Sequence, residues 1–256
     1  MAAPTINTDY PARWHSPRGG ARPLAIIAHG TVGVDSRRYL QRGGDRADGS
    51  DRQVSIHVLI QKDGTIYRMV KDEDAAHHAG GIRRPDGTLS SRMSILGTVY
   101  RGHQVNTHSL GFELENLQNG HDPYPDAQLM ALGWQINQWR VRWGHLSVIR
   151  HATIDPGRRS DTVGLSVAQI ELWAVRAAEA AARKHYTVKA TAGANVRSGR
   201  STSARVLQVL GPGAAWSGFE THGQKITIAG FGSTDLWVCD TDGRCVWRGL
   251  LDEVPT

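Results

Sequence analysis

The segment Leu24-Ala-Ile-Ile-Ala-His29-Gly-Thr31 carries the clearest fold signal in the sequence. Its first five residues form a continuous apolar run, which is typical of a strand buried on both faces. The run ends in a histidine that is followed by a glycine. In open α/β sheets, sites form at the carboxyl ends of the strands. We therefore expect a buried strand over residues 24–29, with His29 at its functional end.

Other apolar segments extend this strand into a sheet. Residues 55–61 and 65–70 are expected to be two strands, because the Asp63-Gly64 pair between them is a strong hairpin signal. Residues 109–117 alternate between apolar and polar side chains, and residues 146–150 form another short apolar run. The sequence thus predicts several strands around the first one.

Two helices follow the strand at residues 109–117. In segment 126–143 the apolar residues fall on one helix face, at i, i+3, i+7, i+10 and i+14, namely Leu129, Leu132, Ile136, Trp139 and Trp143. A second helix is expected to open at Ser166, where Gln169 completes a capping box, and to run to about His185. Residues 72–106 show no clean period, so we expect a loop with little regular structure there. Strands and helices together indicate an α/β domain.

The pattern changes after His185. Residues 186–256 are short β-prone runs broken by Gly, Ser and Asp, without a helical period. This pattern predicts a small all-β module. We therefore expect two domains, at residues 1–185 and 186–256.

Composition and charge exclude several classes of protein. The chain has 256 residues, and 30 Lys and Arg against 24 Asp and Glu give a net charge of +6. The basic residues are scattered and do not alternate with aromatics on one face, so we expect no nucleic-acid partner. No apolar run approaches the roughly 18 residues that span a bilayer, so we expect no membrane insertion. The first residues lack the basic start and apolar core of a secretory signal, so we expect none. We also expect the protein to be a monomer.

The two cysteines pose a question of strand register. Cys239 and Cys245 flank Asp242-Gly243, which favours a two-residue turn. That turn would place the two sulfurs on opposite faces of a hairpin, so we expect free thiols. A three-residue loop would instead set Cys239 opposite Cys245. Two cysteines in a chain of this length also fit a reducing compartment.

Two histidines and one aspartate form a candidate metal site. His29 and His151 are each expected to end a strand, and Asp161 follows His151 after a polar segment. Two histidines and one carboxylate leave a fourth position open for water, which is the pattern of a catalytic zinc site. Spacing alone is weak evidence, because a hydrogen-bonded or solvated histidine is the commoner case.

Five ordered motifs strengthen the case. They are Ala25-Ile-Ile-Ala-His29, then Val54-Ser-Ile-His57-Val-Leu-Ile-Gln-Lys-Asp-Gly-Thr-Ile-Tyr67, then Ala76-His-His78-Ala-Gly, then Ser109-Leu-Gly-Phe-Glu113-Leu-Glu-Asn116, and then His151-Ala-Thr-Ile-Asp-Pro-Gly-Arg-Arg159-Ser-Asp161. In this order they resemble the zinc-dependent N-acetylmuramoyl-L-alanine amidases of the type-2 amidase family, whose fold the peptidoglycan recognition proteins share. The resemblance covers roughly residues 20–183.

The resemblance implies a mixed central sheet with flanking helices and a zinc ion in a surface groove. His29, His151 and Asp161 match the family's zinc ligands, and Glu113 matches its catalytic glutamate. Arg159 stands where many relatives have lysine, which keeps the charge but replaces a compact ammonium with a planar fork.

The chain departs from the family pattern near the last ligand. Many relatives follow the ligand with Pro-Gly, whereas Thr162-Val163-Gly164 stands here. An Asp-Pro-Gly occurs earlier, so Asp155 is a rival ligand. Some phage relatives place a catalytic tyrosine where Ile56 stands, which leaves that role to Glu113.

Three further histidines belong to the motifs. His77 and His78 stand where relatives often have Trp-His, and we interpret them as lining the groove. His57 alternates with apolar neighbours in its strand, and a role in the core or behind the ligands competes with one at the substrate. We count His57 and His78 as substrate-binding candidates.

The chemistry follows from the residue types. Zinc lowers the pKa of its water to about 7 and polarises a carbonyl group. Glu113 could take the proton of the water and return it to the leaving amine, and Arg159 could stabilise the oxyanion. Alternatively, Glu113 is a strand carboxylate paired with an arginine. Glu115 shares its strand face and is its natural rival.

The second domain has a resemblance of its own. Tyr186-Thr-Val-Lys-Ala, Ala194-Asn-Val-Arg197-Ser-Gly, Ile226-Thr-Ile-Ala-Gly, Leu236-Trp-Val and Gly243-Arg-Cys-Val-Trp247 look like a bacterial SH3 domain, which implies a small SH3-like barrel that binds the cell wall. The stretch from Gly211 to Gly223 is longer than usual there. Trp216 and Phe219 could contact the ligand or simply pack.

We therefore expect a peptidoglycan hydrolase that cleaves the amide between N-acetylmuramic acid and L-alanine, with zinc as cofactor and bacterial peptidoglycan as partner. A wall substrate without a secretory signal favours a phage endolysin, held in the cytoplasm of the infected host and acting on the wall after release. Two alternatives remain. They are a non-catalytic peptidoglycan receptor on the same fold and a zinc peptidase that cuts the stem peptide.

Overall fold

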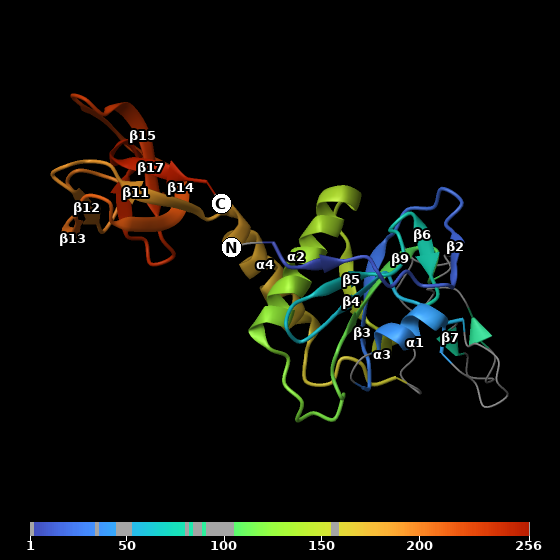
Figure 1. Ribbon diagram of the computed structural model, residues 1–256. Helices are drawn as coiled ribbons and strands as arrows, with labels where there is room; N and C mark the ends of the chain where they lie inside the picture. Colours follow the sequence, from blue (N-terminus) through green and yellow to red (C-terminus); the bar gives the residue numbers. More distant parts are fainter. Residues whose placement is uncertain are drawn as a thin grey trace. The chain divides into compact units, whose positions relative to one another are not determined.

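The computed structural model describes residues 3–33, 36–44, 53–79, 82–83, 89–90, 105–154 and 159–255. The chain divides into two compact units, Ala3–Ala178 and Glu179–Thr256 (Figure 1). Within the described ranges, no helix has the length and apolar character that crossing a membrane requires.

The first unit is built on a mixed sheet of six strands. In spatial order they are β1 (Ile6–Asn7), β5 (Ile66–Arg68), β4 (Val58–Ile60), β9 (Ser109–Leu114), β3 (Ala25–Gly30) and β10 (Ser147–Arg150). Only the β4–β5 hairpin pairs antiparallel, and the other neighbours are parallel. The expectation of a mixed sheet with flanking helices is confirmed, and the buried strand at residues 24–29 lies inside it.

Helices α2 (Asp126–Trp143) and α4 (Val167–Ala182) cover one face of this sheet (Figure 1). They bury the alternate strand residues and their own apolar stripes, namely Ile26, Ala28, Val58, Ile60, Leu110, Phe112, Leu114, Val148, Leu129, Leu132, Ile136, Trp139, Ile170 and Ala174. Each large apolar side chain removed from water in this way contributes roughly 1.5–3 kcal/mol. The sheet is therefore anchored on this side, and the opposite face carries the functional side chains.

Local signals set the helix ends. Ser166 and Gln169 form the expected capping box, in which the Ser166 N–H donates to the Gln169 side chain and the Gln169 N–H donates to the Ser166 hydroxyl. Gly144 ends α2 with a φ of +84°, which glycine adopts without strain. Helix α4 ends at Ala182 rather than near His185, and the next strand begins at Lys184.

The first unit also contains short elements outside this sheet. They are β2 (His15–Pro17), α1 (Arg37–Arg42), β6 (Asp74–Ala76), β7 (Ile82–Arg83), β8 (Leu89–Ser90) and α3 (His151–Ile154). Strands β2 and β6 pair with each other, as do β7 and β8. Residues 72–106, where the sequence predicted a loop with little regular structure, contain the three short strands β6, β7 and β8, and strands of two or three residues are too short to show a period.

The second unit is an all-β sheet. Its seven strands lie in the order β13 (Val206–Leu210), β12 (Ala194–Arg197), β16 (Cys245–Trp247), β15 (Gly232–Cys239), β14 (Ala215–Ile228), β11 (Lys184–Val188) and β17 (Leu251–Val254), with the 3-10 helix η3 (Arg248–Leu250) before the last strand. Across residues 184–254, all of which are described, the order runs from β13 to β17 without a pairing that joins these two ends. The all-β module is confirmed, and a closed barrel is not seen.

The stretch from Gly211 to Gly223 is mostly strand rather than an extended loop. Strand β14 begins at Ala215 and pairs first with β11 and then with β15. At the change of partner, a Cβ on Gly218 would lie 2.4 Å from the carbonyl oxygen of Cys239, so only glycine fits there. Trp216 packs on the core of this unit and donates its indole N–H to the Val238 carbonyl.

The expectation of free thiols was wrong. Cys239 lies directly opposite Cys245 in the β15–β16 pair, and the two form a disulfide. The Asp240 N–H donates to the Arg244 carbonyl, so the connection is a three-residue loop with Gly243 at φ +75°. The Asp240 carboxylate also accepts the N–H groups of Asp242 and Arg244, which stabilises this loop over the shorter turn.

Candidate functional site

The candidate site lies at the carboxyl ends of three parallel strands. His29 on β3 is in direct register with Glu113 on β9, so both side chains leave the same face of the sheet. Arg150 at the end of β10 is in register with Ala28, which sets the next residue, His151, beside His29. The face that carries these side chains is the one that α2 and α4 leave uncovered.

His29, His151 and Asp161 come together at this edge. The ligand atoms of the three side chains all lie within 4.8 Å of one another. A carboxylate oxygen of Asp161 is 3.3 Å from Nδ1 of His151 and 4.0 Å from Nδ1 of His29. All three residues are buried, with 4%, 2% and 6% of their surface exposed for His29, His151 and Asp161.

The bonding of His151 fits a metal ligand. Both of its ring nitrogens are buried, and neither makes a hydrogen bond within the described residues. Although Nδ1 is near Asp161, the contact lacks hydrogen-bond geometry. Buried polar atoms are normally satisfied, and two histidines with one carboxylate are a donor set that suits zinc. The residues present therefore fit this metal.

His151 does not end a strand as expected. Strand β10 stops at Arg150, and His151 begins the single turn of α3. The guanidinium of Arg150 then holds the segment that carries the aspartate, because it donates to the carbonyl oxygens of Ser160, Asp161 and Thr162. Arg150 thereby fixes Asp161 relative to His151.

Glu113 has an altered acidity. Burial and the nearby Asp161 carboxylate raise the pKa of Glu113 to about 8, whereas the positive charge of Arg159 opposes the rise. Arg159 itself is exposed at the edge of the site. A carboxyl group with a pKa near neutrality can both accept and donate a proton at the pH of a cell. Glu113 thus interacts electrostatically with the candidate ligand Asp161, and Arg159 with the candidate ligand His29.

His29 and His78 are in contact. Nε2 of His29 is 2.9 Å from Nδ1 of His78. Burial, reinforced by nearby positive or potentially positive groups, holds the pKa of both histidines well below the usual range. Both rings are thus neutral at physiological pH, the state in which an imidazole binds a metal.

His57 does not reach the site surface. Its residue has no exposed area, and its Nδ1 accepts the Gly111 N–H at 3.0 Å. Its Nε2 lies 2.8 Å from a guanidinium nitrogen of Arg18 and 3.1 Å from the Asp74 carbonyl oxygen. Burial and the adjacent Arg18 lower the pKa of His57 to about 3. The expectation that His57 contacts substrate is therefore corrected in favour of a role in the core.

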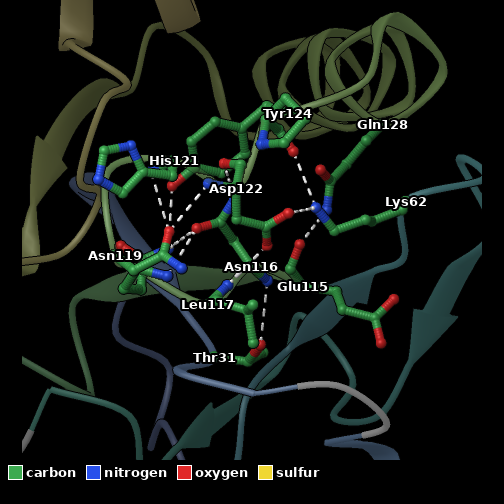
Figure 2. Close-up of polar contacts among 12 residues, drawn as sticks. Thr31, Lys62, Glu115, Asn116, Leu117, Asn119, His121, Asp122, Tyr124 and Gln128 are labelled. Carbon is green, nitrogen blue, oxygen red and sulfur yellow. Dashed lines mark hydrogen bonds and ion pairs between the residues drawn. The ribbon is translucent and has the colours of Figure 1, made fainter.

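The loop of residues 116–122, which follows β9, is held in place by polar contacts. Figure 2 shows Asp122 at its centre, where the carboxylate accepts the Lys62 ammonium and the Leu117 N–H. The Asp122 carbonyl accepts the Asn116 amide, and its N–H donates to Asn119. The ion pair with Lys62 and the bond from Leu117 lower the pKa of Asp122. These contacts tie residues 116–122 to the β4–β5 hairpin.

Gln118 of this loop and the nearby Tyr124 also form hydrogen bonds with Val163, in the segment that carries Asp161. Gln118 accepts the Val163 N–H at 2.8 Å, and the Tyr124 hydroxyl donates to the Val163 carbonyl at 3.1 Å. Gln118 donates in turn to Tyr124. A Cβ on Gly30 would lie 2.0 Å from the Gln118 amide, so Gly30 leaves the room that Gln118 occupies. Sequence reasoning missed Arg150, Gln118 and Tyr124, since no spacing links them to the motifs.

Three candidates from the sequence remain. Asp155, the rival ligand, falls outside the described residues. Trp216 belongs to the second unit, where it packs as described above. Glu115 follows β9, with its N–H bonded to the Ile60 carbonyl.

The chain matches a known protein family. Residues 19–162, more than half of the chain, match the family model described as N-acetylmuramoyl-L-alanine amidase. No curated protein matches the chain.

Several solved structures are similar to it. The solution structure of AmpD from Citrobacter freundii is 21% identical over 68% of this chain and 91% of its own, with a TM-score of 0.44. AmiD from E. coli is 23% identical over 62% of this chain and 60% of its own, with a TM-score of 0.40. Its structure is a complex with anhydro-N-acetylmuramic acid-L-Ala-D-gamma-Glu-L-Lys. The endolysin LysCS from Clostridium intestinale is 19% identical over 67% of this chain and 95% of its own, with a TM-score of 0.42. At such identities and TM-scores, function does not follow from the likeness.

Proposed function

The chain belongs to the N-acetylmuramoyl-L-alanine amidase family, and we propose that it hydrolyses the amide between N-acetylmuramic acid and L-alanine with the help of a zinc ion. The observation that carries the proposal is the buried group of His29, His151 and Asp161, in which both ring nitrogens of His151 lack a hydrogen bond. These three residues would hold the metal.

The metal, when bound, supplies a more acidic water and polarises the carbonyl of the substrate. Glu113 takes the proton from the attacking water at its carboxylate and passes it to the leaving amine of L-alanine. In the metal-free chain, burial and the nearby Asp161 carboxylate raise the pKa of Glu113 to about 8, so this carboxyl group is able to hold a proton near neutral pH.

Arg159 stabilises the negative charge that develops on the carbonyl oxygen. It is exposed at the edge of the site, and its charge reaches Glu113 and His29. A cation at this position is most effective where charge appears only during the reaction. Its planar guanidinium can donate two parallel hydrogen bonds to the oxygens of the substrate.

The wider setting is part of the same proposal. We propose that the second unit, whose motifs resemble a bacterial SH3 domain, binds the cell wall and that Trp216 contributes to that binding. The chain would serve as a phage endolysin that is made in the cytoplasm of the infected host, acts as a monomer and meets peptidoglycan after release. Its net positive charge favours approach to an anionic wall.

Digestion of purified peptidoglycan tests the proposed bond. Mass spectrometry of the soluble products should show stem peptides with a free L-alanine N-terminus and muramic acid with a free lactyl carboxyl group. Peptides cut inside the stem would instead indicate a zinc peptidase. Binding of the wall without any cleavage, in protein loaded with zinc, would indicate a receptor.

A further inference from the structure

The ring of His78 lies directly behind the candidate ligand His29. The two rings meet edge to face with centroids 5.1 Å apart, and Nε2 of His29 is 2.9 Å from Nδ1 of His78. The other nitrogen of His78, Nε2, is 3.2 Å from Oγ of Ser109 on β9. His78 therefore links His29 to Ser109.

The direction of each hydrogen bond follows from Ser109. Its hydroxyl lies 2.5 Å from the carbonyl oxygen of Val105, which can only accept, so the hydroxyl proton is used there. Oγ of Ser109 must then accept from the Nε2–H of His78. A neutral imidazole carries one N–H, so Nδ1 of His78 is an acceptor and His29 donates to it through Nε2–H.

This chain of bonds determines which atom of His29 is free. With its proton on Nε2, His29 keeps the lone pair on Nδ1, the nitrogen that lies 4.0 Å from the Asp161 carboxylate. We propose that His78, fixed by Ser109, is a positioning residue that holds His29 in the tautomer and orientation in which Nδ1 binds the metal. The inference rests on the proposed metal site.

The surroundings hold His78 in place for this role. The side chain of Asn106 accepts the backbone N–H groups of His78 and Ala79. A Cβ on Gly111 would lie 2.7 Å from Nδ1 of His78, so the glycine makes room for the ring. Because residues alternate along a strand, Ser109 and Gly111 share the sheet face of Glu113. The motif from Ser109 to Glu113 thus shapes the support of His29 as well as the proposed acid–base group.

This role replaces the expectation that His78 binds substrate. Both of its ring nitrogens are engaged within the protein, so the ring has no polar atom left to offer. Partners that orient a metal-binding histidine typically change metal affinity by about 10–100-fold when they are lost. Such a residue is recognised by a loss of affinity that a matched hydrogen-bond acceptor restores.

The test is the zinc affinity of the full chain, measured by competition with a chelator. We expect His78→Leu to raise the dissociation constant about 10–100-fold. His78→Asn should stay close to the unaltered protein, because the asparagine oxygen can accept from His29 where Nδ1 did. His77→Leu is the matched control, since the His77 ring lies near Gln53 and Ser16 rather than His29.

Each outcome is decisive. If the unaltered protein binds no zinc, the proposed metal site is wrong. If it binds zinc and His78→Leu binds equally well, or if His78→Asn is as weak as His78→Leu, the positioning role is wrong. Nitrogen-15 NMR of the unaltered metal-free chain gives a second test that does not depend on how the variants fold. It should show His29 and His78 protonated at Nε2, and protonation of His29 at Nδ1 would overturn the inference.

Discussion

His29 and Glu113 lie directly opposite each other on the parallel strands β3 and β9. Paired residues of neighbouring strands project from the same face of a sheet, so a proposed metal ligand and a proposed proton carrier are placed side by side by backbone pairing alone. Helices α2 and α4 bury the other face. The relative position of the two groups is thus set by the core of the domain rather than by a mobile loop.

Replacing Glu113 should separate chemistry from metal binding. Glu113→Gln keeps the shape and hydrogen-bonding capacity of the side chain but removes the base. General acid–base catalysis contributes about 10²–10⁴-fold, so kcat should fall by that order. Zinc content, measured by elemental analysis, should not change.

Glu115→Gln is the matched control for this substitution. It removes the same charge two residues further along the chain, beyond the end of β9. Activity should fall far less than in Glu113→Gln. A larger loss in Glu115→Gln, with the fold and metal intact in both variants, would show that Glu113 has been given the wrong role.

The raised pKa of Glu113 also predicts a pH dependence of stability in the metal-free protein. Between the ordinary glutamate pKa of about 4.5 and the folded value of about 8, the folded state binds a proton that the unfolded state has released. The free energy of unfolding should therefore fall as pH rises through this window, by up to about 1.4 kcal/mol per pH unit. In Glu113→Gln this contribution is absent. Urea unfolding at several pH values would refute the assignment if both proteins gave parallel curves.

The three proposed ligands should not tolerate truncation. His151→Ala should lose bound zinc and activity together, because a two-ligand site is weak, and Asp161→Ala should do nearly the same. Asp155→Ala should retain nearly stoichiometric zinc. Metal analysis after dialysis distinguishes the two aspartates, and the reverse result would make Asp155 the ligand.

The hydrogen bond between Gln118 and Val163 should affect how firmly zinc is held, although neither residue is a proposed ligand. Gln118→Ala removes the acceptor of the Val163 N–H and the donor to Tyr124. Losing a hydrogen bond costs about 1 kcal/mol of stability, and the freed segment should hold Asp161 less firmly, so zinc should dissociate faster. His121→Ala, an exposed position of the same loop, is the control. Equal rates of zinc dissociation in the two variants would show that the hydrogen bond between Gln118 and Val163 does not contribute to holding the metal.

The disulfide offers a test that is independent of the site. Alkylation without a reductant should leave both cysteines unmodified in the mass spectrum, and alkylation after reduction should label both. A closed loop as short as that between Cys239 and Cys245 should contribute about 2 kcal/mol to stability. The second unit should therefore unfold at lower temperature in a reductant. Labelling of both thiols without reduction would contradict the disulfide.

Much of the first unit could be predicted from the sequence, because its signals are local. The apolar run before His29, the Asp63-Gly64 hairpin and the periodic face of α2 each specify their own element, and the structure contains all three. The gathering of His29, His151 and Asp161 was expected from a family resemblance rather than from spacing, and the structure brings these residues together.

Other features depend on contacts that local patterns do not encode. Arg150 and Gln118 support Asp161 through backbone atoms, so their partners leave no trace in the residue types around them. The Asp242-Gly243 signal favoured a two-residue turn, but hydrogen bonds to the Asp240 side chain stabilise the longer loop. The burial of His57 depends on how β4 and β9 pack, which its alternating neighbours left open.

The most direct measurement uses the metal-stripped full chain and a soluble muropeptide that carries the amide between N-acetylmuramic acid and L-alanine. Mass spectrometry follows release of the peptide before and after one equivalent of zinc is added, with His151→Ala in parallel. Zinc-dependent hydrolysis of this amide predicts no cleavage without zinc, a single cut that exposes the L-alanine amine once zinc is restored, and no recovery in His151→Ala. A cut at another bond, or undiminished cleavage in the metal-free protein, would contradict it.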